Sequence, residues 1–106
     1  MVTKKISLLD PNFKRYQEKI IKALKNLFPT ASIYLFGSRA RKTNTPVSDI
    51  DIAINTGSKL STRQMRIAKE NLDDLNIPLS IDLVDMNNAQ EELRIKIVTE
   101  GTLWTD

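Results

Sequence analysis

Residues 36–52 contain two short motifs whose side chains could act on a phosphate compound. Gly37 and Ser38 follow one apolar run, and Asp49 and Asp51 lie in the next. A glycine lets the backbone approach a ligand closely, and a serine that opens a helical turn leaves N–H groups free for phosphate. Two carboxylates at positions i and i+2 of a strand project from one face and could share metal ions about 4 Å apart. Together the two motifs predict chemistry on a nucleoside triphosphate.

A third aspartate strengthens this interpretation. Asp82 is the charged residue within an otherwise apolar segment, residues 80–84. If that segment pairs beside the strand of Asp49 and Asp51, three carboxylates converge. Like charges opposed across strands cost up to ~1 kcal/mol, which a cation would offset. The alternative is that all three aspartates simply lie on the hydrated surface of their strands.

Two arginines follow the Gly-Ser pair. Arg39 and Arg41 could clamp phosphate oxygens through their guanidinium groups. The alternative, a solvated basic loop, stays open for Arg41. Trp104 lies close to the C-terminus beside Leu103, where it could close the core or contact a partner.

The composition excludes several kinds of catalysis. The chain has 106 residues and contains neither cysteine nor histidine. Thiolate chemistry, disulfides, cysteine-bound zinc and a Ser-His-Asp triad are therefore absent. Acid–base and metal chemistry fall to carboxylates, which favour Mg²⁺ or Mn²⁺ over zinc.

Charge and length limit the class of protein. The net charge is +3 and the isoelectric point is about 9.3. This mild excess suits an anionic ligand, and a nucleic-acid-binding domain is the least favoured interpretation. The N-terminus lacks an apolar signal region and no stretch could span a bilayer. We expect a soluble cytoplasmic protein with a single domain over residues 1–106.

The first part of the chain predicts a helix and two strands. Asp10 can cap a helix whose first residue is Pro11. Apolar residues then recur at helical spacing, at Phe13, Tyr16, Ile20, Leu24 and Leu27. Strands are expected over residues 31–36 and 49–55, with a short helical turn over 38–42 between them.

The second part predicts two more helices around a third strand. Ser61 and Gln64 form a capping-box pattern, followed by a buried face at Met65, Ala68, Leu72 and Leu75. A strand is expected over residues 79–84. Asn88 can cap a last helix, which buries Leu93 and Ile97 and ends at Gly101.

This order of elements predicts an α/β fold of the α+β type. The link between the first two strands is too short for a crossover helix, so they are expected to be antiparallel. The helix between the second and third strands permits parallel pairing. We therefore predict an α-β-α-β-α-β-α order with a small mixed sheet flanked by helices.

The motifs taken together resemble the minimal nucleotidyltransferase family of the DNA polymerase beta superfamily. The resemblance lies in residues 35–41, the spacing to residues 48–52, the position of Asp82, and the segment 92–103. It covers most of the chain and implies the nucleotidyltransferase fold.

The resemblance also implies a mechanism. Asp49, Asp51 and Asp82 would be catalytic and would hold Mg²⁺ or Mn²⁺, with Asp82 also able to accept a proton. Gly37 and Ser38 would bind the triphosphate of ATP. An acceptor hydroxyl would attack the α-phosphorus and release pyrophosphate. One departure is Lys42, because the family often has glycine at this position. Lysine could add a phosphate contact or disfavour a turn with positive φ.

The resemblance further implies a protein partner. Small members of the family are typically encoded beside a helical HEPN-type protein, as antitoxin and toxin, and can transfer AMP to a tyrosine of that toxin. We therefore expect a metal-dependent protein adenylyltransferase, with homo- and hetero-oligomers both left open. The alternative is a non-catalytic binding module that neutralises its partner by forming a complex.

Overall fold

The computed structural model describes residues 11–105. Four helices and four strands follow one another in this range. They are α2 (Pro11–Leu27), β1 (Ser32–Phe36), α3 (Gly37–Arg41), β2 (Ile50–Asn55), α4 (Thr62–Asp73), β3 (Ile81–Asp85), α5 (Glu91–Glu100) and β4 (Thr102–Thr105). The predicted α/β order is confirmed, and a fourth strand is added at its end.

The strands form one mixed sheet in the order β3-β2-β1-β4. β1 is antiparallel to both β2 and β4, whereas β2 and β3 are parallel. Both predicted pairings are confirmed. The reason is the length of each connection: α4 provides the crossover that parallel strands need, and α3 with its loop does not.

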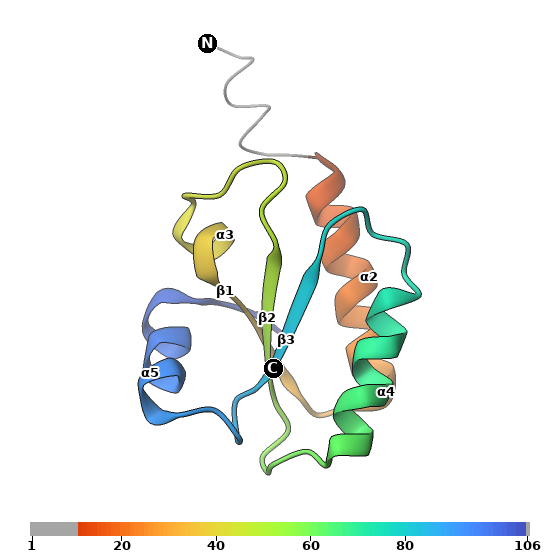
Figure 1. Ribbon diagram of the computed structural model, residues 1–106, viewed down its shortest axis with the longest axis vertical. Coiled ribbons are helices and arrows are strands. Elements are labelled where there is room, and N and C mark those ends of the chain that lie inside the picture. The colour runs from red at the N-terminus through yellow and green to blue at the C-terminus, as the bar shows by residue number, and fades with distance from the viewer. Residues whose placement is uncertain (1–10, 106) are drawn as a thin grey trace.

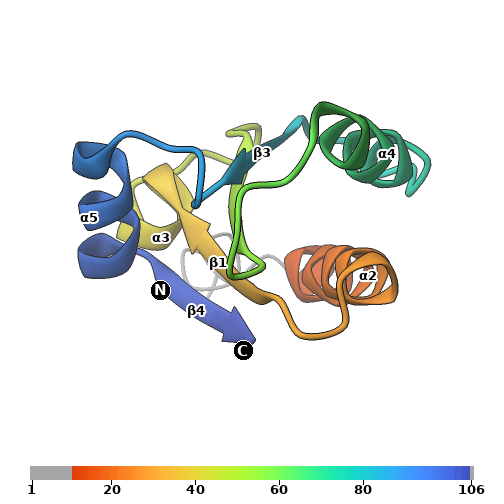
Figure 2. The same cartoon turned by 90° about the horizontal axis from the view of Figure 1, so that it is seen from below.

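Helices cover both faces of this sheet. Figure 2 shows α2 and α4 on one side and α3 and α5 on the other, and the same two layers flank the strands in Figure 1. The larger core lies under α2 and α4, and its fully buried side chains include Ile20, Leu24, Ile33, Ile52, Ile54 and Ala68. A smaller core under α5 joins Ala53, Met86 and Ile97. The predicted apolar faces of these helices are confirmed.

Local signals account for how two of the helices begin. The Ser61 hydroxyl accepts a hydrogen bond from the Gln64 N–H (3.0 Å), and the Gln64 side chain accepts one from the Ser61 N–H (2.8 Å). The predicted capping box is therefore confirmed. α2 begins at Pro11 as expected. Its proposed cap, Asp10, lies outside the described residues.

The start of α5 differs from the prediction. The helix begins after Gln90, not after Asn88. The Asn88 N–H instead donates to the Asp85 carbonyl (3.0 Å) and closes a turn at the end of β3. β3 itself starts at Ile81, two residues later than predicted. The helix starts later than predicted because Asn88 belongs to the turn after β3.

The end of α5 is at Gly101, as predicted, but for another reason. Its φ of −79° is available to any residue. A Cβ at this position would collide with the Ile97 carbonyl oxygen and lie 2.9 Å from that of Leu35, so glycine permits both the tight end of α5 and its close approach to β1. Beyond it, Trp104 contacts the ring of Phe13 edge to face, with centroids 6.1 Å apart. Trp104 therefore helps to close the larger core.

No helix within residues 11–105 is both long enough and apolar enough to cross a membrane.

Candidate active site

Three residues form a row across the sheet at the end where β2 begins. Asp51 on β2 pairs with Phe36 on β1 and with Asp82 on β3. Side chains two residues apart on a strand share a face, so Asp51 lies on the face of Ala53, and Asp82 on that of Val84. Both apolar neighbours pack with Ile97 of α5. The two carboxylates therefore project from the face that α3 and α5 cover.

Asp49 and Asp82 are exposed, and Asp51 is half-buried. Asp49 directly precedes the first residue of β2. Asp82 lies on an edge strand, since β3 has a neighbour on one side alone. It therefore combines the two predicted alternatives, contact with water and a place beside Asp51.

Like charge perturbs the middle carboxylate. Burial raises the pKa of Asp51, the charges of Asp82 and then Asp49 raise it further, and Arg41 partly opposes them. Asp82 and Asp49 therefore both act electrostatically on Asp51. Within residues 11–105, however, no three His, Cys, Asp or Glu side chains are grouped closely enough to hold a metal ion.

Gly37 lies against this row. Its φ is +72°, a conformation that favours glycine. A Cβ at this position would collide with the carboxylate of Asp51. Glycine is thus required for two reasons, the sharp turn from β1 into α3 and the space that Asp51 occupies.

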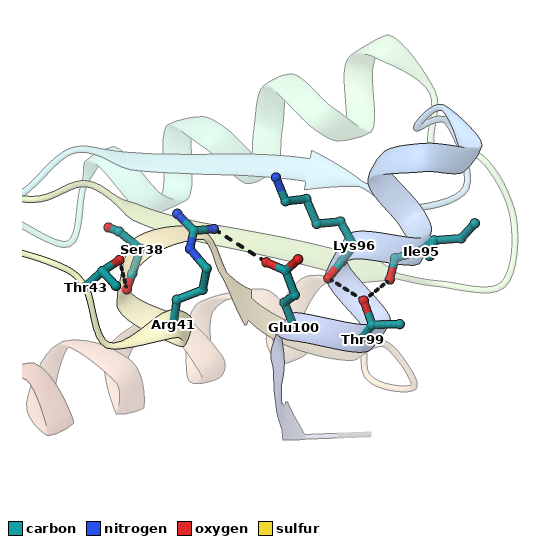
Figure 3. A network of polar contacts seen from close by, with 7 residues as sticks. All are labelled: Ser38, Arg41, Thr43, Ile95, Lys96, Thr99 and Glu100. Carbon is teal, nitrogen blue, oxygen red and sulfur yellow. Dashed lines mark hydrogen bonds and ion pairs between the residues drawn. The ribbon is translucent and has the colours of Figure 1, made fainter.

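Ser38 does not cap α3, and that prediction was wrong. The helix begins one residue earlier, at Gly37, after Phe36. The positive φ of Gly37 lets the chain enter the helix directly, so Ser38 lies within the first turn. Its carbonyl accepts hydrogen bonds from the Thr43 N–H (2.9 Å) and the Thr43 hydroxyl (3.4 Å), which hold the end of α3 (Figure 3).

Arg39 holds the loop that leads to Asp49. Its Nε and Nη2 atoms donate to the Ser48 carbonyl (3.2 and 3.0 Å), and Nη2 also donates to the Pro46 carbonyl (3.3 Å). The guanidinium carbon lies 4.9 Å from the centre of the Phe13 ring. The sequence predicted a phosphate contact, whereas these bonds occupy much of the guanidinium edge. Nothing local in the sequence distinguishes a phosphate from a backbone carbonyl as its target.

Arg41 stays beside the row of carboxylates. Its guanidinium lies 3.8 Å from the Glu100 carboxylate, and both side chains are about two-fifths exposed (43% and 44%). Figure 3 shows this pair between α3 and α5. Because both side chains are exposed and the distance between their charged atoms is long, this ion pair contributes little to stability. Arg41 is therefore available to an anionic ligand.

Lys42 adopts the left-handed conformation that the sequence put in question, with φ 62° and ψ 31°. Its N–H closes the end of α3 on the Arg39 carbonyl (3.4 Å). The turn therefore forms with lysine present, at the energetic cost of a non-glycine residue in this region.

Asp85 serves the opposite end of the sheet. It is buried and accepts hydrogen bonds from the Leu60 N–H (2.8 Å) and the Asn87 N–H (3.0 Å). It is the last residue of β3 and has a structural role. A hollow of about 360 Å³ lies between the end of α4 and the start of β3, and its lining includes none of Asp49, Asp51 and Asp82.

Comparison with known proteins identifies the family. The profile of the "Polymerase beta, Nucleotidyltransferase" family matches residues 18–105. The protein adenylyltransferase MntA of Shewanella oneidensis is 36% identical over 91 residues, which cover 83% of this chain and 64% of the relative. The chain thus spans somewhat under two-thirds of that relative's length. A Methanocaldococcus jannaschii protein is 31% identical over 91 residues, covering 86% of this chain and 92% of the relative.

Solved structures agree with the fold. A toxin–antitoxin complex with AMP-PNP contains a chain that is 34% identical, with a TM-score of 0.73, covering 85% of this chain and 73% of that one. A complex of a tri-AMPylated Shewanella oneidensis HEPN toxin with its MNT antitoxin gives 30% identity and a TM-score of 0.69, covering 88% and 72%. The chain therefore belongs to the polymerase beta nucleotidyltransferase family.

Proposed function

We propose that this chain transfers AMP from ATP to a hydroxyl group of a partner protein, and that the partner is a HEPN-type toxin for which the chain is the antitoxin. The observation that carries the proposal is the Asp51–Asp82 pair beside Gly37, on the face that α3 and α5 cover. Similarity to the MntA adenylyltransferase and to a complex containing an AMPylated HEPN toxin supports the choice of reaction and partner. The site of action is the cytoplasm, where ATP is abundant.

Asp49, Asp51 and Asp82 would hold Mg²⁺ or Mn²⁺ after side-chain rotations that bring the three carboxylates closer together than they lie in this structure. The donor set fits a hard cation because it consists of carboxylates alone. Burial, and then repulsion from Asp82 and Asp49, raise the pKa of Asp51, and a divalent cation would relieve that repulsion. When bound, the metal would neutralise charge on the triphosphate and polarise its α-phosphate.

The triphosphate would lie against the start of α3. Gly37 leaves the backbone open to a ligand, Ser38 is in the first helical turn, and Arg41 can exchange Glu100 for a phosphate oxygen. Arg39 supports this arrangement by holding the loop before Asp49.

The reaction follows from these positions. The acceptor oxygen attacks the α-phosphorus in line, a new P–O bond forms, and the bond to the β-phosphate oxygen breaks as pyrophosphate leaves. Asp82, which is exposed on an edge strand, can accept the proton of the acceptor hydroxyl. The partner supplies that hydroxyl.

Labelling tests this function. Incubation of the chain with a HEPN-type partner protein, Mg²⁺ and α-labelled ATP should label the partner. Asp51→Asn and Asp82→Asn should each lower the labelling rate by a factor of ~10² or more, as expected for loss of metal or acid–base groups. Asp73→Asn, an exposed change on α4, is the matched control and should label at the wild-type rate. Labelling that continues unchanged in both site variants would contradict the mechanism.

A second function is a non-catalytic binding module. It is favoured by exposed apolar side chains on α5 and β4: Ile95 (54% exposed), Val98 (59%) and Leu103 (48%). If the Asp51→Asn, Asp82→Asn double variant still neutralised the toxin in cells as well as the wild type, complex formation would be the function.

A further inference from the structure

A small hollow opens between α3 and α5, next to Gly37. It has a volume of about 190 Å³ and is lined by Phe36, Gly37, Arg41, Leu93, Lys96 and Glu100. Phe36 is in register with Asp51, so the hollow lies on the same face of the sheet as the carboxylates. A ligand held by Asp51 and Gly37 would therefore extend directly into it.

The rim of the hollow is charged. Arg41 reaches it from α3, and Lys96 reaches it from α5, toward the same side (Figure 3). Glu100 lies 3.8 Å from Arg41 in an exposed ion pair. Two cations and one anion leave a net positive rim, and such an ion pair is weak enough to yield to a more highly charged anion.

The apolar walls of the hollow can support the side chain of Lys96. Phe36 and Leu93 are half-buried apolar residues that pack with Ile97 beneath α5. A lysine stem can lie along such a surface while its ammonium group stays in water. Lys96 lines the same hollow as Gly37, so its ammonium group is within the surroundings of the Gly37 backbone.

We propose that Lys96, at the rim of this hollow, is a further contact for the β- and γ-phosphates of the nucleotide. The inference rests on the proposed function, because it assigns part of the same ATP site. Arg41 leaves Glu100 when the nucleotide binds, and Glu100 then opposes binding by its like charge. Polyphosphate is favoured over the adenine base because the rim carries two cations beside an open glycine backbone.

Direct binding measurements test this without any partner protein. The probes are MgATP, AMP and inorganic tripolyphosphate, titrated calorimetrically into the wild type and four variants. Lys96→Gln should weaken MgATP and tripolyphosphate about tenfold, the loss of one charge-assisted contact, and leave AMP unchanged. Lys96→Arg should restore most of the affinity. Glu100→Gln should strengthen both polyphosphates several-fold.

Lys69→Gln is the matched control, since Lys69 is an exposed lysine on α4, across the sheet from the hollow. It should bind all probes as the wild type does. Thermal unfolding of each variant checks that the fold is intact, which is expected because Lys96 is exposed.

Two results would overturn the inference. If Lys96→Gln bound MgATP and tripolyphosphate like the wild type, Lys96 would have no role. If it weakened AMP as much as MgATP, the hollow would hold the nucleoside. Failure of the proposed function can be told apart from failure of this inference. If the binding measurements gave the expected pattern but no AMP were transferred to a partner, the phosphate site would stand and the proposed function would not.

Discussion

The carboxylate of Asp51 occupies the space that a side chain at Gly37 would need: a single methyl group on Gly37 would collide with it. The turn that follows β1 and the middle carboxylate of β2 therefore cannot vary independently. This relationship links the two motifs, which are separate in the sequence, into one site.

Replacing Gly37 with alanine should therefore disturb both the turn after β1 and the position of the Asp51 carboxylate. The positive φ alone costs about 1–2 kcal/mol, and displacement of Asp51 adds to this. Because 1 kcal/mol shifts Tm by roughly 4–8 °C in a domain of this size, Gly37→Ala should melt several degrees lower. A double-mutant cycle with Asp51→Gly measures the coupling. Additive losses would show that the two residues do not share space.

Asp51→Asn should stabilise the metal-free protein at neutral pH. The pKa of Asp51 is raised in the folded state, by burial and then by Asp82 and Asp49. The folded protein thus binds this proton more tightly than the unfolded chain, so stability is greatest below the usual pKa of about 3.9 and falls as pH rises through the folded pKa. Urea unfolding in EDTA, at pH values from below about 3.9 up to 7, should show that the free energy of unfolding depends less on pH in Asp51→Asn than in the wild type. A wild type more stable than the variant at pH 7 would contradict the assignment.

Adding a divalent metal should make the wild type more stable than Asp51→Asn. A ligand that binds only the folded state adds stability, about 2.7 kcal/mol at 100 times its Kd. Mg²⁺ or Mn²⁺ should therefore raise the Tm of the wild type, and raise it much less in Asp51→Asn or Asp49→Asn. Ca²⁺-free buffer with EDTA is the baseline, and Asp73→Asn is the control that should respond like the wild type. Equal shifts in all of these proteins would mean that the metal binds elsewhere.

Arg39 should act through the loop before Asp49. Arg39→Lys keeps the charge but loses the forked contact with the Ser48 and Pro46 carbonyls. We expect a loss of about 1.5–3 kcal/mol in stability and a metal affinity roughly tenfold weaker, as for other residues that orient ligands. Mn²⁺ titration followed by electron paramagnetic resonance measures the affinity. Arg66→Lys, exposed on α4, is the control, and an unchanged Mn²⁺ affinity in Arg39→Lys would exclude the positioning role.

Lys42→Gly should stabilise the protein. Lys42 has a positive φ of 62°, and a non-glycine residue in that region costs about 1–2 kcal/mol, part of which glycine loses again through its greater freedom in the unfolded chain. The expected net gain is about 0.5–1 kcal/mol by urea unfolding. Asn76, with a φ of 56°, is a matched comparison. Asn76→Gly should gain less because asparagine tolerates this conformation. A larger gain at Asn76 would contradict the explanation.

The sequence alone determined the features that depend on neighbours in the chain. The capping box at Ser61, the apolar runs that form β1 and β2, and the apolar face of α4 are all local patterns. They respond to the periods of helices and strands, and the structure follows them. The lengths of the connections then determined which strands run parallel. The Gly-Ser turn and the three aspartates could be named as candidate site residues because each lies in or beside an apolar run that is visible in the sequence.

Only the tertiary structure decided how distant groups meet. Arg39 donates to backbone carbonyls and Lys96 reaches the surroundings of Gly37 from another helix, and no periodicity encodes either contact. The pairing of β4 with β1 likewise depends on the close approach that Gly101 permits. A guanidinium or ammonium group binds whichever acceptor packing brings within reach. Its target is therefore a property of the packed layers, whereas its presence near the site is a property of the sequence.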